Sequence, residues 1–215
     1  MRRPLIALTA LNAWGALALQ FTLMIAVTWS GIGPWLATLK FFSYFTILCN
    51  LLVGLSCTFA LVGQDSRCGR FFGAARVRGA VALYIAVTGG IYIFVLRTLW
   101  APQGAQWLAD VMLHYATPLL YLVSWSAWLR FGRLEWTDAL RWLLFPLAYM
   151  LWTLLRGAWL HDYPYPVVNV DALGMARTLV NALAVSGLFL VLGLLLIALD
   201  RALRRRDPPP NHRCG

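Results

Sequence analysis

The chain has 215 residues, of which 61% are hydrophobic and only 12% are charged, and its mean hydropathy is +0.70. A soluble domain carries about 25% charged residues, so the composition excludes an ordinary soluble protein and indicates an integral membrane protein. The net charge of +10 would fit a nucleic-acid partner only if the cations were gathered on one soluble surface.

Six apolar stretches are each long enough to cross about 30 Å of hydrocarbon as a helix of roughly 20 residues. In chain order they cover residues 5–29, 36–62, 79–100, 107–129, 139–155 and 176–199. The first is interpreted as a retained helix, because the run to Trp29 is too long for a signal peptide and lacks a clear cleavage site. We therefore predict an all-α, polytopic bundle of six transmembrane helices.

The predicted bundle forms a single domain over residues 1–203, because the connections are short and no composition shift separates a second domain. Residues 204–215 combine charge with a proline run that cannot continue a helix. Such a segment buries too little apolar surface to fold. We expect a disordered tail there.

The basic residues predict the orientation of the bundle. Fourteen of the 18 Lys and Arg residues lie in the N-terminus, the second and fourth connections and the tail. These segments share one side of a six-helix bundle, and the positive-inside rule makes that side cytoplasmic. We predict a multi-pass membrane protein with both termini in the cytoplasm. The charge then serves topology and attraction to anionic lipid, and we predict no nucleic-acid partner.

Two polar residues within the apolar stretches are candidates for catalysis. Thr46 and His114 lie at matching depths, roughly 9–10 Å from the outer ends of the second and fourth predicted helices at ~1.5 Å per residue. A histidine within reach of a hydroxyl can remove its proton and so activate it as a nucleophile. The alternative for Thr46 is a hydroxyl bonded back to a carbonyl one turn earlier, as is common in membrane helices.

Ser43 and Asn50 recur with Thr46 at helical spacing, which predicts one polar face on the second helix. Either side chain is a candidate for orienting the Thr46–His114 pair or for donating a hydrogen bond to an oxyanion.

Four cations fall on the predicted outer side, where long side chains reach the interface. Ordinary anchoring of helix ends is one interpretation of Lys40, Arg97, Arg156 and Arg177. The functional alternative is a cationic collar that binds an acidic group of the substrate. The adjoining segment Arg156–Gly174, here called the aromatic loop, also contains His161, Tyr163 and Tyr165 as candidate substrate contacts. Its other interpretation is an interfacial aromatic belt.

Three segments together resemble the androgen-induced protein family of intramembrane threonine hydrolases and its bacterial six-helix relatives. They are KFFSYFTILCN (Lys40–Asn50), LHYATPLL (Leu113–Leu120) and RGAWLHDYPYP (Arg156–Pro166). The resemblance implies hydrolysis of fatty acid esters of hydroxy fatty acids, with Thr46 as the family threonine and His114 as the family histidine. It implies a lipid ester substrate within the bilayer and, through the bacterial relatives, a place in the bacterial inner membrane. We expect no cofactor or metal, because the sequence has neither a nucleotide-binding glycine loop nor a metal-type spacing of Cys and His.

Two other functions stay open at this point. A non-catalytic protein that binds or transports a lipid or small molecule would use the same polar pocket without turnover. A zinc hydrolase would need several ligands near one another, but His212 lies in the tail and only His114 and His161 fall on the outer side. The sequence does not specify an oligomeric state.

Overall fold

The structure, a computed structural model, describes residues 2–99, 101–128 and 133–204, and within these ranges every regular element is a helix. The longer helices are α1 (Arg2–Phe41), α2 (Phe45–Leu61), α4 (Ala75–Ile91), α6 (Thr117–Trp128), α8 (Leu144–Leu160) and α10 (Met175–Arg204). The shorter ones are α3 (Arg67–Gly73), α5 (Gly104–Val111), α7 (Trp136–Trp142), η3 (Pro166–Val168) and α9 (Val170–Leu173). Two five-residue π-helical turns, η1 (Tyr92–Leu96) and η2 (Met112–Ala116), complete the set.

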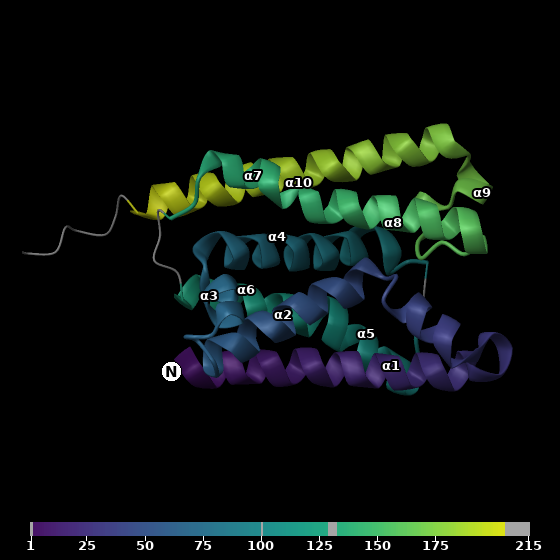
Figure 1. Cartoon of the computed structure of the whole chain (residues 1–215), viewed down its shortest axis with the longest axis horizontal. Coiled ribbons are helices and arrows are strands. Elements are labelled where there is room, and N and C mark those ends of the chain that lie inside the picture. The colour runs from purple at the N-terminus through teal and green to yellow at the C-terminus, as the bar shows by residue number, and fades with distance from the viewer. Residues whose placement is uncertain (1, 100, 129–132, 205–215) are drawn as a thin grey trace, which may run out of the picture.

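Helix α4 lies at the centre of the bundle, between α2 and α6 on one side and α10 on the other (Figure 1). The side chains of Leu83, Ile85 and Val87 on α4 are almost fully buried. Helix α1 packs along α2 and α6, and α10 packs against α7 and α8. The hydrophobic core of the bundle therefore surrounds α4.

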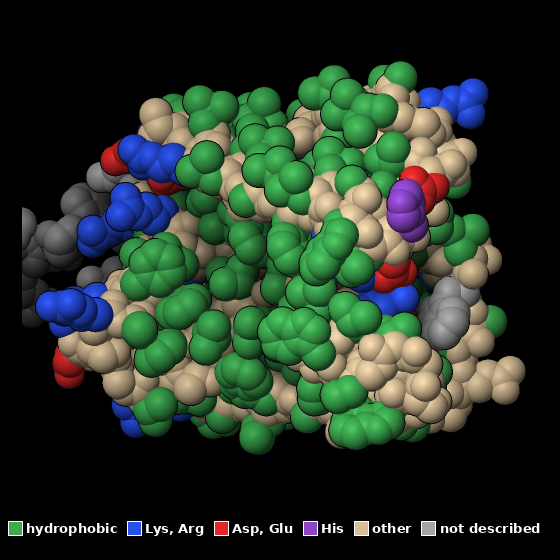
Figure 2. Space-filling view, turned by 45° about the vertical axis from the view of Figure 1, so that its right-hand side comes forward, with side chains coloured by type: hydrophobic (Ala, Val, Ile, Leu, Met, Phe, Trp, Pro, Cys, Tyr) green, Lys and Arg blue, Asp and Glu red, His purple; other side chains and the backbone are tan. Residues whose placement is uncertain are grey.

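Hydrophobic side chains cover the middle of the molecule, and Lys and Arg gather toward its ends (Figure 2). Four helical stretches are long and apolar enough to cross a membrane: Arg3–Phe41, Ala75–Leu96, Trp136–Leu160 and Met175–Leu203. Helix α2, Phe45–Leu61, is apolar but shorter. The predicted all-helical class is confirmed for the described residues, and by length and composition four of their helical stretches are candidate membrane spans, against the six that were predicted.

The predicted helix boundaries need correction at two places. Residues 36–62 were expected to form one helix, but α1 runs on to Phe41 and α2 begins only at Phe45. Within α1, Gly33 has φ 75° and is followed by Pro34. Because this backbone is not helical and proline cannot continue the helix, the chain turns back here (Figure 1). The predicted helix 107–129 is also divided, by the π turn η2.

The remaining predicted stretches correspond to observed elements with shifted ends. Residues 79–100 fall on α4 and η1, residues 139–155 on α7 and α8, and residues 176–199 on α10. The predicted tail, residues 204–215, lies outside the described residues beyond Arg204.

Candidate functional site

The break before α2 places Thr46 in the first turn of that helix. Tyr44 is the N-cap residue, with extended backbone (φ −89°, ψ 127°) and no side-chain cap hydrogen bond. The first N–H groups of a helix have no partner within the helix and carry partial positive charge. The N–H of Thr46 donates instead to the hydroxyl of Tyr165, at 3.3 Å. Thr46 therefore offers both its hydroxyl and a helix-terminal N–H at one point.

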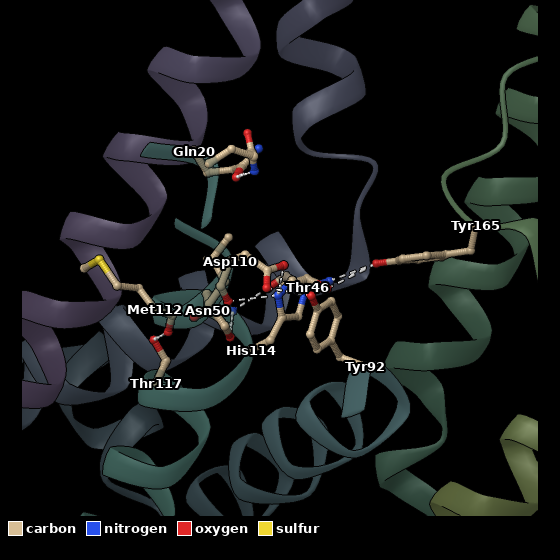
Figure 3. Close-up of polar contacts among 11 residues, drawn as sticks. Gln20, Thr46, Asn50, Tyr92, Asp110, Met112, His114, Thr117 and Tyr165 are labelled. Carbon is tan, nitrogen blue, oxygen red and sulfur yellow. Dashed lines mark hydrogen bonds and ion pairs between the residues drawn. The ribbon is translucent and has the colours of Figure 1, made fainter. Parts of the chain in front are cut away.

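His114 lies in the π turn η2, between α5 and α6. Such turns widen the helix locally and are frequent at functional sites. The Nε2 atom of His114 lies 3.4 Å from the Oγ1 atom of Thr46 (Figure 3). This distance is looser than an ideal hydrogen bond, as is common for nucleophile–base pairs in unliganded enzymes. The structure thus brings together the two residues that the sequence singled out.

A carboxylate that the sequence reasoning did not select completes this arrangement. The Nδ1 atom of His114 lies 3.1 Å from Oδ1 of Asp110 and 3.1 Å from the Asp110 carbonyl. Both atoms are acceptors, so Nδ1 carries the proton and Nε2 of the neutral ring is left to accept from Thr46. Asp110 is 6% exposed and Thr46 7%. The three side chains have the order of a nucleophile, a base and an orienting carboxylate.

Tyr92 contacts both Asp110 and His114. It starts the other π turn, η1, and its hydroxyl donates to Oδ2 of Asp110 at 2.5 Å. Its ring stacks on the imidazole of His114, with 3.8 Å between centroids and 13° between planes. Each oxygen of the Asp110 carboxylate is therefore paired, and the imidazole has little freedom to rotate.

No family model, curated protein or solved structure compared with the chain matches it. The assignment of a function therefore rests on the geometry of this site. The family resemblance stays a prediction.

The side chains of Asn50 and Ser43 both donate hydrogen bonds to backbone carbonyls. The side-chain amide of Asn50 donates to the carbonyls of Thr46 (2.9 Å) and Leu113 (3.3 Å), so it ties α2 to the turn that carries His114. Ser43 lies in the break before α2 and donates to the carbonyl of Leu39. The predicted shared face fails for Ser43 because the helix does not run through residues 42–44.

A cavity of about 350 Å³ opens next to Thr46. Its volume is in the range of small-molecule sites. Thr46 and Tyr165 lie on its wall, and most of the remainder is apolar. Helices α2, α4, α8 and α10, the π turn η1 and the aromatic loop supply the other lining residues, among them Val87, Ile91, Met150 and Phe189. His114 and Asp110 are not among the described residues that line it.

Two of the predicted collar cations are paired within the protein. Arg156 is buried and binds both the carbonyl and the carboxylate of Asp162, while Lys40 binds the same carboxylate at 3.0 Å. Asp162 belongs to the aromatic loop, so these ion pairs fasten that loop to α8 and to the end of α1. A substrate carboxylate would have to compete with Asp162 for these cations.

The ion pairs of Asp162 predict an acid-sensitive loop. Burial alone would raise the pKa of the Asp162 carboxyl, but Arg156 and Lys40 outweigh it and hold the pKa below its ordinary value. A lowered folded-state pKa gives stability that is present above the unfolded value of about 3.9 and is lost as the pH falls through the folded value. The thermal midpoint of the parent minus that of Asp162→Asn should be constant from about pH 7 to 5 and shrink below about pH 4. A difference that grows on acidification would contradict this sign.

The other predicted contact residues lie farther out. Arg97 is exposed at the end of η1. His161 caps α8 with a left-handed backbone (φ 51°) and is paired with Asp171 at 2.9 Å, with its side chain 74% exposed. The structure does not bring Arg97 or His161 to Thr46.

Tyr163 packs against Gly157 so closely that a Cβ at residue 157 would overlap its ring. We expect Gly157→Ala to push Tyr163 and the aromatic loop away and to lower the free energy of unfolding by about 1–3 kcal/mol. Gly187→Ala is the matched control on α10, because its Cβ would meet nothing within 4 Å and alanine favours helix by about 1 kcal/mol. Thermal unfolding in detergent measures both; equal midpoints would contradict the contact.

Proposed function

We propose that this chain is an intramembrane lipid ester hydrolase in which Thr46 is the nucleophile and His114 the general base. The observation that carries the proposal is the chain of contacts from Thr46 through His114 to Asp110, set beside an apolar cavity. Polar groups of this kind are costly in a membrane protein unless they have a use. We further propose the finer topology: six membrane crossings, cytoplasmic termini and a bacterial inner membrane.

The first half of the reaction forms an acyl-enzyme. As the Oγ1 atom of Thr46 attacks the ester carbonyl carbon, its proton passes to Nε2 of His114. The imidazolium that forms is stabilised by the Asp110 carboxylate at Nδ1. When the tetrahedral intermediate collapses, the bond to the alcohol oxygen breaks and His114 returns the proton to that oxygen. The second half repeats these steps with water as the nucleophile, releasing the fatty acid and restoring the Thr46 hydroxyl.

The oxyanion of each intermediate needs donors close to Thr46. The Thr46 N–H and the Tyr165 hydroxyl already lie together, 3.3 Å apart. The nucleophile's own N–H serves this purpose in serine hydrolases. Burial raises the pKa of Tyr165 to about 12, so its phenol keeps its proton at neutral pH and can donate it.

The Tyr165 hydroxyl should therefore matter more to rate than to binding. We expect Tyr165→Phe to lower kcat by about 10²-fold, the size of effect found when one oxyanion donor is removed, with KM little changed. Steady-state kinetics on one ester substrate measures this. Tyr163→Phe is the control, since Tyr163 meets Gly157 and not Thr46. A loss confined to KM would instead assign Tyr165 to substrate binding.

The cavity favours a substrate with a long apolar acyl group. Its described walls are mainly Val, Leu, Ile, Phe and Met side chains, with Thr46 and Tyr165 at one side. Burial of each methylene of an acyl chain contributes roughly 0.8 kcal/mol. Fatty acid esters of hydroxy fatty acids, the class that the family resemblance implies, fit this description.

The test is turnover by the purified full chain in lipid nanodiscs, with a fatty acid ester of a hydroxy fatty acid as substrate. A hydrolase releases one acid and one hydroxy acid per ester, and product accumulates beyond one equivalent of protein. The competing function is binding or transport of a lipid or small molecule. The cavity is the observation that supports it. It predicts saturable binding with the ester recovered intact.

A further inference from the structure

A second cavity, of about 370 Å³, lies at the opposite end of α2 from Thr46. It is formed where the end of α2, helix α3 and the start of α4 meet. Two arginines from different helices line it: Arg70 of α3, which also donates to the backbone carbonyl of Asp65, and Arg78 of α4. Among the described residues of its lining, none is acidic. The cavity is thus a concave site of positive charge.

Further features of the lining also favour an anion. Ala74 is the N-cap of α4 and lines the cavity, and no side chain caps that helix. First-turn N–H groups carry partial positive charge and bind phosphate in many proteins. The hydroxyl of Ser56, which is buried and 3.2 Å from the hydroxyl of Tyr121, adds a polar group to the same wall.

The remaining wall of the cavity is aromatic. Phe59 of α2 and Phe72 of α3 stack face to face, with 5.6 Å between centroids and 6° between planes, and both line the site. A ligand here would meet guanidinium groups and apolar rings together. Figure 2 shows Lys and Arg gathered beside hydrophobic side chains at the end of the molecule where Figure 1 places α3.

We infer that this cavity binds a phosphate group, and that the phosphate is the headgroup of an anionic phospholipid. Basic pockets between membrane helices recognise lipid headgroups in this way. Arg70 and Arg78 supply the charge that pairs with the phosphate, and the phenylalanines contact the adjoining glycerol and acyl carbons. This site is separate from the proposed hydrolase site at Thr46, and the inference does not depend on the proposed function.

Gly73 allows a test that leaves the arginines in place. Gly73 lines the cavity, and a Cβ built on it would meet nothing within 4 Å. Gly73→Asp should add a carboxylate to the wall of the cavity and so offset part of its positive charge. We expect it to weaken binding of phosphatidylglycerol at least fivefold, the effect of removing about one cation beside an anionic lipid. Gly73→Asn, of equal size but neutral, should bind as the parent does.

Native mass spectrometry of the detergent-purified full chain, titrated with phosphatidylglycerol or phosphatidylcholine, measures this binding. Arg70→Gln should also lose about fivefold, whereas Arg67→Gln, which removes the same charge from the same helix outside the cavity, should not. Size-exclusion elution and thermal midpoints establish that each variant is folded. Equal losses for Arg67→Gln and Arg70→Gln, or equal binding of the two lipids and no effect of inorganic phosphate, would overturn the inference.

Inorganic phosphate separates the two sources of the ligand. If it raises the thermal midpoint of the parent and of Gly73→Asn but not of Gly73→Asp, while the two lipids bind alike, the cavity is a phosphate site for a soluble ion. If phosphatidylglycerol binds selectively and inorganic phosphate has no effect at millimolar concentration, the headgroup and its acyl chains are both required.

Discussion

Thr46→Ala is expected to abolish ester turnover, to below about 10⁻³ of the parent rate, while leaving the protein folded. Removing the nucleophile removes the acyl-enzyme route altogether, and alanine suits the first turn of α2. The measurement is the initial rate of fatty acid release by matched amounts of protein in nanodiscs, with thermal midpoints taken in parallel.

Two matched variants separate chemistry from packing in this experiment. Thr46→Ser keeps the hydroxyl and should retain measurable turnover. Thr178→Ala on α10 removes another buried hydroxyl, which donates to the carbonyl of Gly174, and should leave the rate unchanged. Equal rates for Thr46→Ala and Thr46→Ser would remove Thr46 from the mechanism.

Asp110→Asn should have the second-largest effect, a fall in kcat of roughly 10²- to 10⁴-fold with little change in KM. The carboxylate fixes the tautomer of His114 through Nδ1 and stabilises the imidazolium. An amide of the same size can present an N–H instead, which would leave the proton on Nε2, where it blocks transfer from Thr46. Steady-state kinetics on one ester, which give kcat and KM separately for the parent and the variant, test this.

Tyr92→Phe is the control for Asp110→Asn. It removes the hydroxyl that donates to the other carboxylate oxygen but keeps the ring stacked on His114. Loss of this hydrogen bond should lower the rate less than Asp110→Asn does, because the carboxylate keeps its contact with Nδ1 of His114. A larger effect of Tyr92→Phe than of Asp110→Asn would show that Tyr92, and not the carboxylate, sets the state of the histidine.

The helical class was predictable because apolar stretches of roughly 20 residues have the length of membrane-spanning helices. The breaks within the helices were harder to predict. Gly33 and Pro34 are visible signals of a bend, and they precede the predicted start at residue 36 by three and two residues. The break over residues 42–44 has no such signal, since it contains neither glycine nor proline. It depends on tertiary contacts, such as the hydrogen bond from the Tyr149 hydroxyl to the carbonyl of Ser43.

The pairing of Thr46 with His114 could be predicted from the sequence because both are polar residues at equal depth in apolar helices. Asp110 carried a signal that was missed: a carboxylate four residues before a histidine in an apolar segment places the two on one helix face. The contact of Tyr165 with Thr46 could not be predicted from the sequence, because it depends on how Arg156 and Lys40 fasten the aromatic loop through Asp162. The role of Tyr92 depends likewise on the packing of η1 against η2.

The activated state of Thr46 is the central claim, and covalent labelling tests it most directly. The detergent-purified protein is treated with a lipid-tailed fluorophosphonate, which forms a bond from an activated oxygen to phosphorus as fluoride leaves, and the modified peptide is identified by mass spectrometry. We predict an adduct on Thr46 that is absent in Thr46→Ala and strongly reduced in His114→Ala. A folded parent protein that forms no adduct on Thr46, or that labels equally well without His114, would contradict the proposed mechanism.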